Sequence, residues 1–295
     1  MIPLGLLAKF KNLKEAFLRI DSRTIYFYSF LIGCLTGGVA ILFYLLIHKL
    51  TYLLFDQGAR LPLVARESGY QAFGMGDSST RYLLVLVLPA VGGLLVGLLT
   101  KYWGKEAKGT GVDTLLDSFH NHSGQMRRRT PFLKFTASTL TLSTGGSAGK
   151  EGPMALIGAG IGSLVGRWVK MGARAKRTLL LAGSAGGLGA IFRAPLGGAI
   201  TAVEVLYKED FEADALLPCI IASVTAYTIF SSVVGFGHIL AFEANLFASP
   251  IQLIFYVLLG LFCSGASYVF IWLFRSLRSD FFKKIKIPLY LKPAL

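Results

Sequence analysis

The sequence predicts an all-α polytopic membrane protein built of broken, tilted helices. Of its 295 residues, 54% are hydrophobic and only 16% are charged, a composition far from that of a soluble domain. Uncharged runs long enough to cross ~30 Å of hydrocarbon occur at residues 24–47, 82–100 and 246–274. Shorter apolar runs broken by glycine lie between them, which is typical of transporter folds with discontinuous helices.

The net charge of +14 comes from clusters of lysine and arginine beside the apolar runs, for example at residues 127–129 and 167–177. The positive-inside rule expects such clusters in cytoplasmic loops. We therefore predict a multi-pass protein of the plasma or inner membrane, with the N-terminus in the cytoplasm and the lipid bilayer, rather than nucleic acid, as its surroundings.

In chain order, residues 1–22 are expected to form a basic amphipathic helix on the cytoplasmic membrane surface. Residues 24–47 then span outward, residues 49–81 form an external loop, and residues 82–100 return inward. Two short helices are predicted next, with a turn on the cytoplasmic side between them. Four further helical segments follow. The predicted segments are 114–121 and 132–142, with the cytoplasmic turn at 127–134, and then 178–191, 195–204, 215–234 and 246–274.

Residues 143–166 contain the most informative stretch of the sequence. Glu151 stands between glycines where a Gly/Ser-rich run becomes helix-forming, and Pro153 fits the first turn of a helix, where its missing N–H is no loss. A helix beginning at about residues 149–152 leaves the amides of Lys150, Glu151 and Gly152 unpaired at its positive end, which is a ready anion site. Irregular backbone and a carboxylate are tolerated in a bilayer only beside a cavity or pathway, so the stretch predicts an intramembrane anion site with Glu151 in its mouth.

A second turn of the same kind precedes the first short helix. Gly109 and Gly111 flank Thr110, whose hydroxyl adds a donor to the amides of the helix start. Further along, glycines recur every four residues at 158, 162 and 166, and small residues recur at 183, 187 and 190. This spacing predicts that the helices carrying them approach closely. The three cysteines, Cys34, Cys219 and Cys263, lie in apolar runs and are expected to be buried, with no disulfide and no metal pair.

Three segments resemble motifs of the CLC family of chloride channels and chloride/proton antiporters, in the order in which that family has them. Residues 149–153, GKEGP, resemble its GREGP or GKEGP motif, residues 109–112 its GSGIP motif, and residues 187–198 its GLAAAFNAPLAG-type segment. The resemblance covers the chain from about residue 25 to its end. It implies the first inverted repeat of a CLC-type fold over residues 23–242 and the start of a second, truncated repeat over residues 243–295, a half that is not expected to close a selective pore alone.

The resemblance also implies roles for particular residues. Glu151 would be the gating glutamate that swings away or is protonated to let chloride pass. The anion-binding residues would be Gly109, Thr110, Gly111, Gly149, Lys150 and Gly152. Asp113 departs from the family's pattern, which has proline there. A homodimer would form through residues 195–205 and 215–234. Chloride, and possibly protons, would be the transported species, with no cofactor, no metal and no enzymatic activity.

The residue after Glu204 separates two mechanisms. Family antiporters tend to have two glutamates there, the second serving as internal proton acceptor, whereas this chain has Val205. Valine cannot carry a proton, so the sequence favours a channel over a chloride/proton antiporter, although some family antiporters also lack that glutamate. Glu204 itself remains a candidate for an internal proton path. A fluoride-selective variant also stays open, although Thr110 and Pro153 depart from that subgroup.

An unrelated reading concerns Ser147. Residues 145–149, GGSAG, match the GxSxG nucleophile pattern, which would make the protein an intramembrane serine hydrolase. Such an enzyme needs a base beside the serine, and the four histidines lie at predicted helix ends or in loops. We therefore expect transport rather than hydrolysis.

Overall fold

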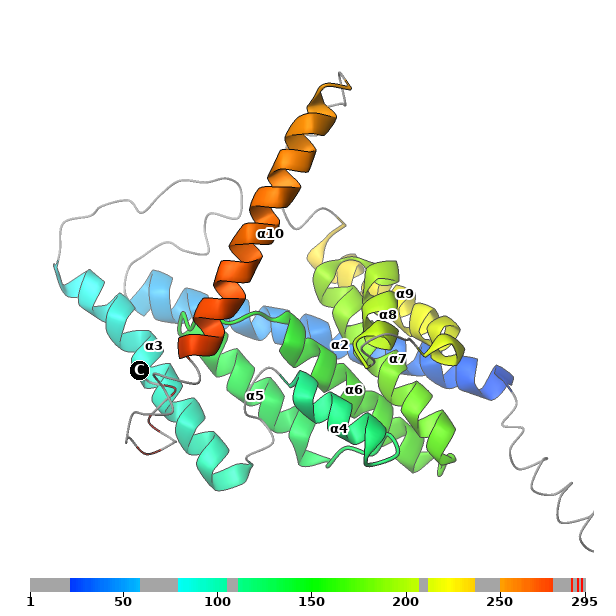
Figure 1. Ribbon diagram of the computed structural model, residues 1–295. Coiled ribbons are helices and arrows are strands. Elements are labelled where there is room, and N and C mark those ends of the chain that lie inside the picture. Colours follow the sequence, from blue (N-terminus) through cyan, green and yellow to red (C-terminus); the bar gives the residue numbers. More distant parts are fainter. Residues whose placement is uncertain are drawn as a thin grey trace, which may run out of the picture.

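The computed structural model of the chain describes residues 22–58, 79–104, 111–206, 212–236 and 250–277, together with residues 288, 291 and 293. Within these ranges the regular structure is helical, with no strand (Figure 1). The helices are α2 (Ser22–Thr51), continued by the π-helical η1 (Tyr52–Gly58), α3 (Ser79–Trp103), α4 (Val112–His120), α5 (Arg129–Ser143), α6 (Glu151–Trp168), α7 (Ala173–Phe192), α8 (Pro195–Glu204), α9 (Ala213–Val234) and α10 (Gln252–Ser276).

Four of the described helical segments are long and apolar enough to cross a membrane: residues 24–57, 85–103, 213–234 and 252–276. Three of them overlap the apolar runs predicted as spans. Exposed apolar side chains such as Phe27 and Leu86 cover the outer faces of α2 and α3, as expected for surfaces in contact with lipid. The chain is an integral membrane protein of all-α architecture.

The core is built around α7, which packs against α2, α6, α8 and α9. Residues 178–191 of α7 are all buried. The predicted close approach of the glycine-rich helices is confirmed, because a Cβ on Gly158 of α6 would collide with the backbone of Gly183 of α7, and a Cβ on Gly183 would collide with Gly158. Gly162 and Gly187 meet the partner helix's backbone in the same way, so α6 and α7 lie backbone to backbone.

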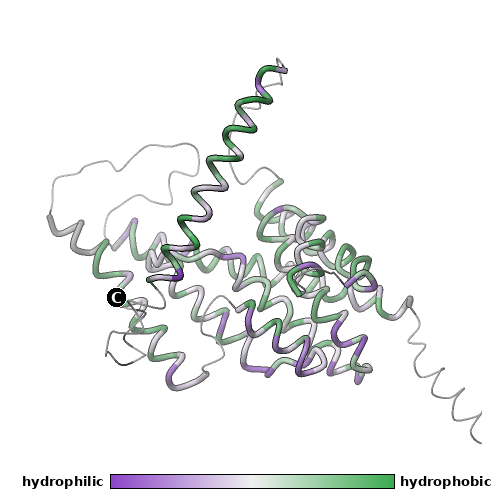
Figure 2. Tube along the Cα trace, viewed as in Figure 1, coloured by the Kyte–Doolittle hydropathy of each residue, from purple (hydrophilic) through white to green (hydrophobic). Residues whose placement is uncertain are grey.

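Helix α10 differs from the others. Every side chain from Leu253 to Arg275 is exposed, and the helix projects from the bundle (Figure 1). Figure 2 shows hydrophobic residues along its length, whereas hydrophilic residues gather at the edge of the bundle below α4 and α5. An apolar helix with exposed side chains along its length is suited to lipid rather than to water.

Several sequence expectations need correction or lie outside the described residues. The external loop expected at residues 49–81 begins too early, because helical structure continues through Gly58. The expected cytoplasmic turn at 127–134 is shorter, since α5 begins at Arg129 and Lys134 is only 5% exposed within it. Burial was right for Cys219 but wrong for Cys263, which is exposed on α10. The surface helix predicted at residues 1–22 lies almost wholly outside the described residues.

Candidate anion site

The first residue of α6 is Glu151, as the sequence predicts. Lys150 is the N-cap, and its carbonyl accepts the amide of Met154 at 3.1 Å. Among the described residues, the amides of Lys150, Glu151 and Gly152 have no hydrogen-bond acceptor, and no side chain caps the helix. The predicted free amides at the positive end of α6 are therefore present.

The carboxylate of Glu151 folds back over this helix start. Its Oε2 atom stands where a Cβ on Gly149 would be, so the absence of a side chain at residue 149 makes room for it. The side chain is half-buried, and within the described ranges it has neither a hydrogen bond nor an ion pair. Glu151 therefore occupies the space next to Gly149, directly before the helix start with the free amides.

Lys150 does not form an ion pair with the neighbouring carboxylate. Its Nζ atom lies 5.5 Å from the centre of the Tyr44 ring of α2, within the range of a cation–π contact. The Tyr44 ring is itself held by a stacked contact with His48 at 5.9 Å and an edge contact with Phe230 at 5.8 Å. The aromatic contact draws the ammonium group of Lys150 toward α2.

The second predicted turn lies partly within the described residues. Gly109 and Thr110 lie outside them, while Gly111 is buried and is the N-cap of α4, with φ at +97°. A Cβ on Gly111 would stand 3.0 Å from the Leu156 side chain of α6. Leu156 is five residues after Glu151, or about 7.5 Å along the helix axis, so the start of α4 lies beside the first turns of α6.

Helices α4 and α6 also point the same way. Beyond the C-terminal end of α4, the amide of Met126 donates to Ser163 Oγ at 2.8 Å, and the Arg167 guanidinium donates to the carbonyl of Met126. Gly111, before α4, thus contacts Leu156 of α6, whereas Met126, after α4, contacts Ser163 and Arg167 nearer the C-terminal end of α6. The positive ends of both helices therefore face away from the end of the bundle at Met126 and Arg167. They face toward the region of Glu151.

The remaining sequence candidates lie elsewhere. Glu204 is the last residue of α8 and is exposed, as is Val205 after it. Ser147 is exposed in the turn between α5 and α6. None of these three side chains is among the contacts described for Glu151 and the amides at the start of α6.

The sequence did not predict the surroundings of two residues. Tyr44 is more than a hundred positions from Lys150, and nothing in its local sequence marks it as the partner of a lysine. Lys134 reads as the end of a basic run, yet it is buried on α5. A lysine in register with the small and hydroxyl residues 137, 138 and 141 of the same helix was the available signal for its burial.

The fold defines a polytopic membrane protein in which helix α6 begins with amides that have no acceptor among the described residues. The family model described as "Voltage gated chloride channel" matches residues 92–295. The chain belongs to this family, the CLC family.

Individual relatives agree with this assignment. The chain is similar to the uncharacterized protein MJ0305 of Methanocaldococcus jannaschii, with 33% identity over 211 residues, covering 72% of the chain and 52% of the relative. It is 28% identical to a putative chloride channel protein ClcB-like of Ralstonia nicotianae, covering 71% of the chain and 49% of that protein. Among solved structures, a slow cyanobacterial Cl⁻/H⁺ antiporter has the same fold, with a TM-score of 0.74 at 22% identity, covering 92% of the chain and 61% of the antiporter.

The chain therefore spans about half the length of the curated relatives that it matches. The expected likeness to part of a CLC protein is confirmed.

Proposed function

We propose that the protein takes part in transmembrane chloride transport, with Glu151 as the gating carboxylate. The observation that carries the proposal is the position of its side chain, folded over Gly149 beside the unpaired amides at the start of α6. A carboxylate at the positive end of a helix imitates a bound anion. When it moves aside or takes up a proton, the same amides become available to chloride.

The amides are suited to transport because they would bind chloride with low affinity. The groups around Gly149, Lys150 and Gly152 replace part of the hydration shell of the ion, and the aligned peptide dipoles favour negative charge. The ammonium group of Lys150, the residue before Glu151, lies over the Tyr44 ring. Chloride would therefore bind weakly enough to leave again, as conduction requires.

A second anion position at the start of α4 is part of the proposal. Gly111 lies against Leu156, close to the first turns of α6. In this proposal, the amides after Gly111, together with the backbone of Gly109 and the hydroxyl of Thr110, would hold chloride on its way past Glu151. Because both helix starts face the same region, an ion could pass from one set of amides to the other.

We favour passive conduction over antiport because of Val205. The residue follows Glu204 at the end of α8, where a second carboxylate would be needed to receive a proton from the cytoplasmic side. Chloride/proton antiport is the alternative, in which Glu204 would have to serve the proton path alone.

Orientation and assembly complete the proposal. The basic loops after α4 and α6 lie at the same edge of the bundle, joined by the bond from Arg167 to the Met126 carbonyl, which supports placing that edge in the cytoplasm. Exposed apolar side chains on α8 and α9, among them Leu196, Ile200 and Leu217, support a homodimer through these helices. No cofactor, metal or enzymatic activity is part of this function.

The experiment is chloride efflux from liposomes that contain the purified protein with a complete CLC pathway, because one repeat alone is not expected to close a selective pore. We expect wild-type efflux to rise on acidification, and Glu151→Gln, which imitates the protonated carboxylate, to conduct at all pH values. Glu204→Gln is the control and should conduct as the wild type does. Absence of chloride efflux from both wild type and Glu151→Gln would refute the proposal.

Proton movement measured in the same liposomes separates the two mechanisms. For a channel, a chloride gradient drives no proton uptake. Coupled uptake that disappears in Glu151→Gln would establish the antiporter instead.

A further inference from the structure

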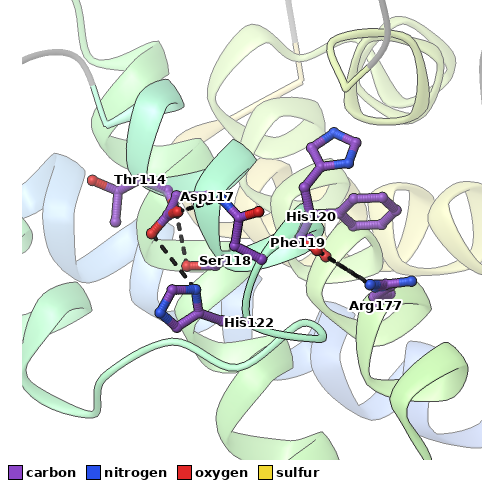
Figure 3. A network of polar contacts seen from close by, with 8 residues as sticks. Thr114, Asp117, Ser118, Phe119, His120, His122 and Arg177 are labelled. Atoms are coloured by element: carbon purple, nitrogen blue, oxygen red, sulfur yellow. Dashed lines mark hydrogen bonds and ion pairs between the residues drawn. The ribbon is translucent and has the colours of Figure 1, made fainter.

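The C-terminal end of α4 has every backbone acceptor occupied. The last four carbonyls of a helix lack partners within it, and here each finds a donor. Asp117 and Ser118 accept the amides of Asn121 and Gly124 at 2.9 and 2.8 Å. The carbonyls of Phe119 and His120 accept Nε and Nη2 of Arg177 at 2.9 and 3.3 Å (Figure 3).

Arg177 reaches these carbonyls from a different helix. It lies in the first turns of α7, and its guanidinium also stands 5.5 Å from the centre of the Phe119 ring. The loop after α4 approaches the same point, because a Cβ on Gly124 would stand 2.6 Å from the Arg177 amide nitrogen. One arginine side chain thus fastens the end of α4 to the helix at the centre of the core.

The opposite end of α4 is the start that we propose for anion binding. The helix has nine residues and is therefore about 13.5 Å long. Its N-cap, Gly111, has no side chain to cap the first turn and meets α6 through Leu156. In a helix this short, a shift or tilt of the C-terminal end also moves the amides at the N-terminal end.

We propose that Arg177 is a positioning residue for chloride at the Gly111 turn. It does not touch the ion; it fixes where the first amides of α4 point by fastening the last carbonyls of the helix to α7. The inference rests on the proposed function and adds to it a residue that controls anion affinity from the cytoplasmic end of α4.

The chemistry of the contact requires arginine. A guanidinium presents donors in a fixed fork and can reach two carbonyls at once, whereas an ammonium group is a point donor on a flexible stem. Its positive charge also stands at the negative end of the α4 dipole, which stabilises the helix. Lysine at this position should therefore restore only part of the effect.

The test measures chloride efflux from liposomes as a function of chloride concentration. In Arg177→Gln, we expect the half-saturating chloride concentration to rise roughly tenfold, because small misplacement of binding groups has effects of this size or larger, while the maximal rate per folded protein changes little. Arg177→Lys should fall between Gln and wild type. A merely structural role would lower the amount of folded protein without moving the half-saturating concentration.

The matched control is Arg174→Gln. Arg174 lies one turn earlier on α7 and is ion-paired with the exposed Asp214 of α9, so its loss removes the same charge from the same helix without touching α4. It should leave the half-saturating concentration unchanged. A second variant is Gly124→Ala. Gly124 has φ at +74°, and a methyl group there would meet the backbone of Lys176 and Arg177, so alanine moves the loop after α4 away from α7 with no change of charge and should also weaken chloride binding.

The outcomes separate this inference from the proposed function. If wild type conducts chloride and folded Arg177→Gln has the wild-type half-saturation, the inference is wrong and the proposed function stands. If Arg177→Gln does not fold, Arg177→Lys and Gly124→Ala decide in its place: unchanged half-saturation in both overturns the inference. If neither wild type nor Glu151→Gln conducts, the proposed function fails and the inference fails with it.

Discussion

The carboxylate of Glu151 lies over the backbone of Gly149, in the space that any side chain on residue 149 would fill. The two residues are neighbours on a helix start whose amides have no acceptor in the described part of the chain. Glycine at 149 is therefore needed for the resting position of the carboxylate, and it does not have a positive φ that would require glycine for the backbone alone.

The first prediction follows from this contact. In Gly149→Ala the new methyl group displaces the carboxylate, which is the flexible end of a side chain and can move. We expect chloride efflux from liposomes to become less dependent on pH, in the direction of Glu151→Gln. Gly38→Ala, at an exposed glycine of α2 with open space around it, is the control. Unchanged pH dependence in Gly149→Ala would show that the carboxylate does not rest over residue 149.

The second prediction concerns the contact between α6 and α7. Gly183→Ala places a methyl group against the Gly158 backbone, which cannot rotate away, and overpacking of this kind costs about 1–3 kcal/mol. We expect a lower unfolding temperature in detergent. Gly38→Ala gains helix propensity without a clash and should raise stability by up to ~1 kcal/mol. Equal melting temperatures for the two variants would contradict the backbone-to-backbone packing.

The third prediction is a coupling between Tyr44 and Lys150. Exposed cation–π contacts are worth ~0.5–1 kcal/mol, so a double-mutant cycle with Tyr44→Leu and Lys150→Met should give a coupling free energy of this size in thermal unfolding. Tyr44→Phe retains the ring and should retain most of the coupling. A coupling free energy of zero in this cycle would mean that another group holds the lysine.

The fourth prediction addresses the GxSxG pattern. Ser147 is exposed in the turn before α6, and its neighbourhood is explained by the amides around Glu151 without a nucleophile. We expect no labelling by a fluorophosphonate probe and no change of chloride efflux in Ser147→Ala. Labelling that Ser147→Ala abolishes would establish a serine hydrolase.

Local sequence signals were sufficient for most of the fold. Long uncharged runs predicted α2, α3 and α10, and Pro153 and Pro195 marked the starts of α6 and α8 closely. The glycines at 158, 162, 183 and 187 predicted the approach of α6 to α7 because their spacing puts them on one helix face. Such features depend on residues a few positions apart, which is where sequence patterns are informative.

Contacts between distant segments could not be predicted in this way. Arg177 reads as one of five basic residues in a loop, and only the folded chain separates it from Arg174, which faces α9. Tyr44 and Lys150 meet because α2 crosses the start of α6, a packing relation that no local pattern encodes. Lys134 is different, because its register with residues 137, 138 and 141 of α5 was a local signal for its burial.

The contact between Gly158 and Gly183 limits how this protein can work. With no side chain between them to yield or repack, α6 and α7 cannot slide or swing relative to each other, so they form a stationary frame. The carboxylate of Glu151 is the flexible end of a side chain at one end of this frame, whereas α4 is fastened to α7 through Arg177. In the proposed function, opening the path to chloride therefore needs the displacement of a single side chain rather than the rocking of one half of the protein against the other.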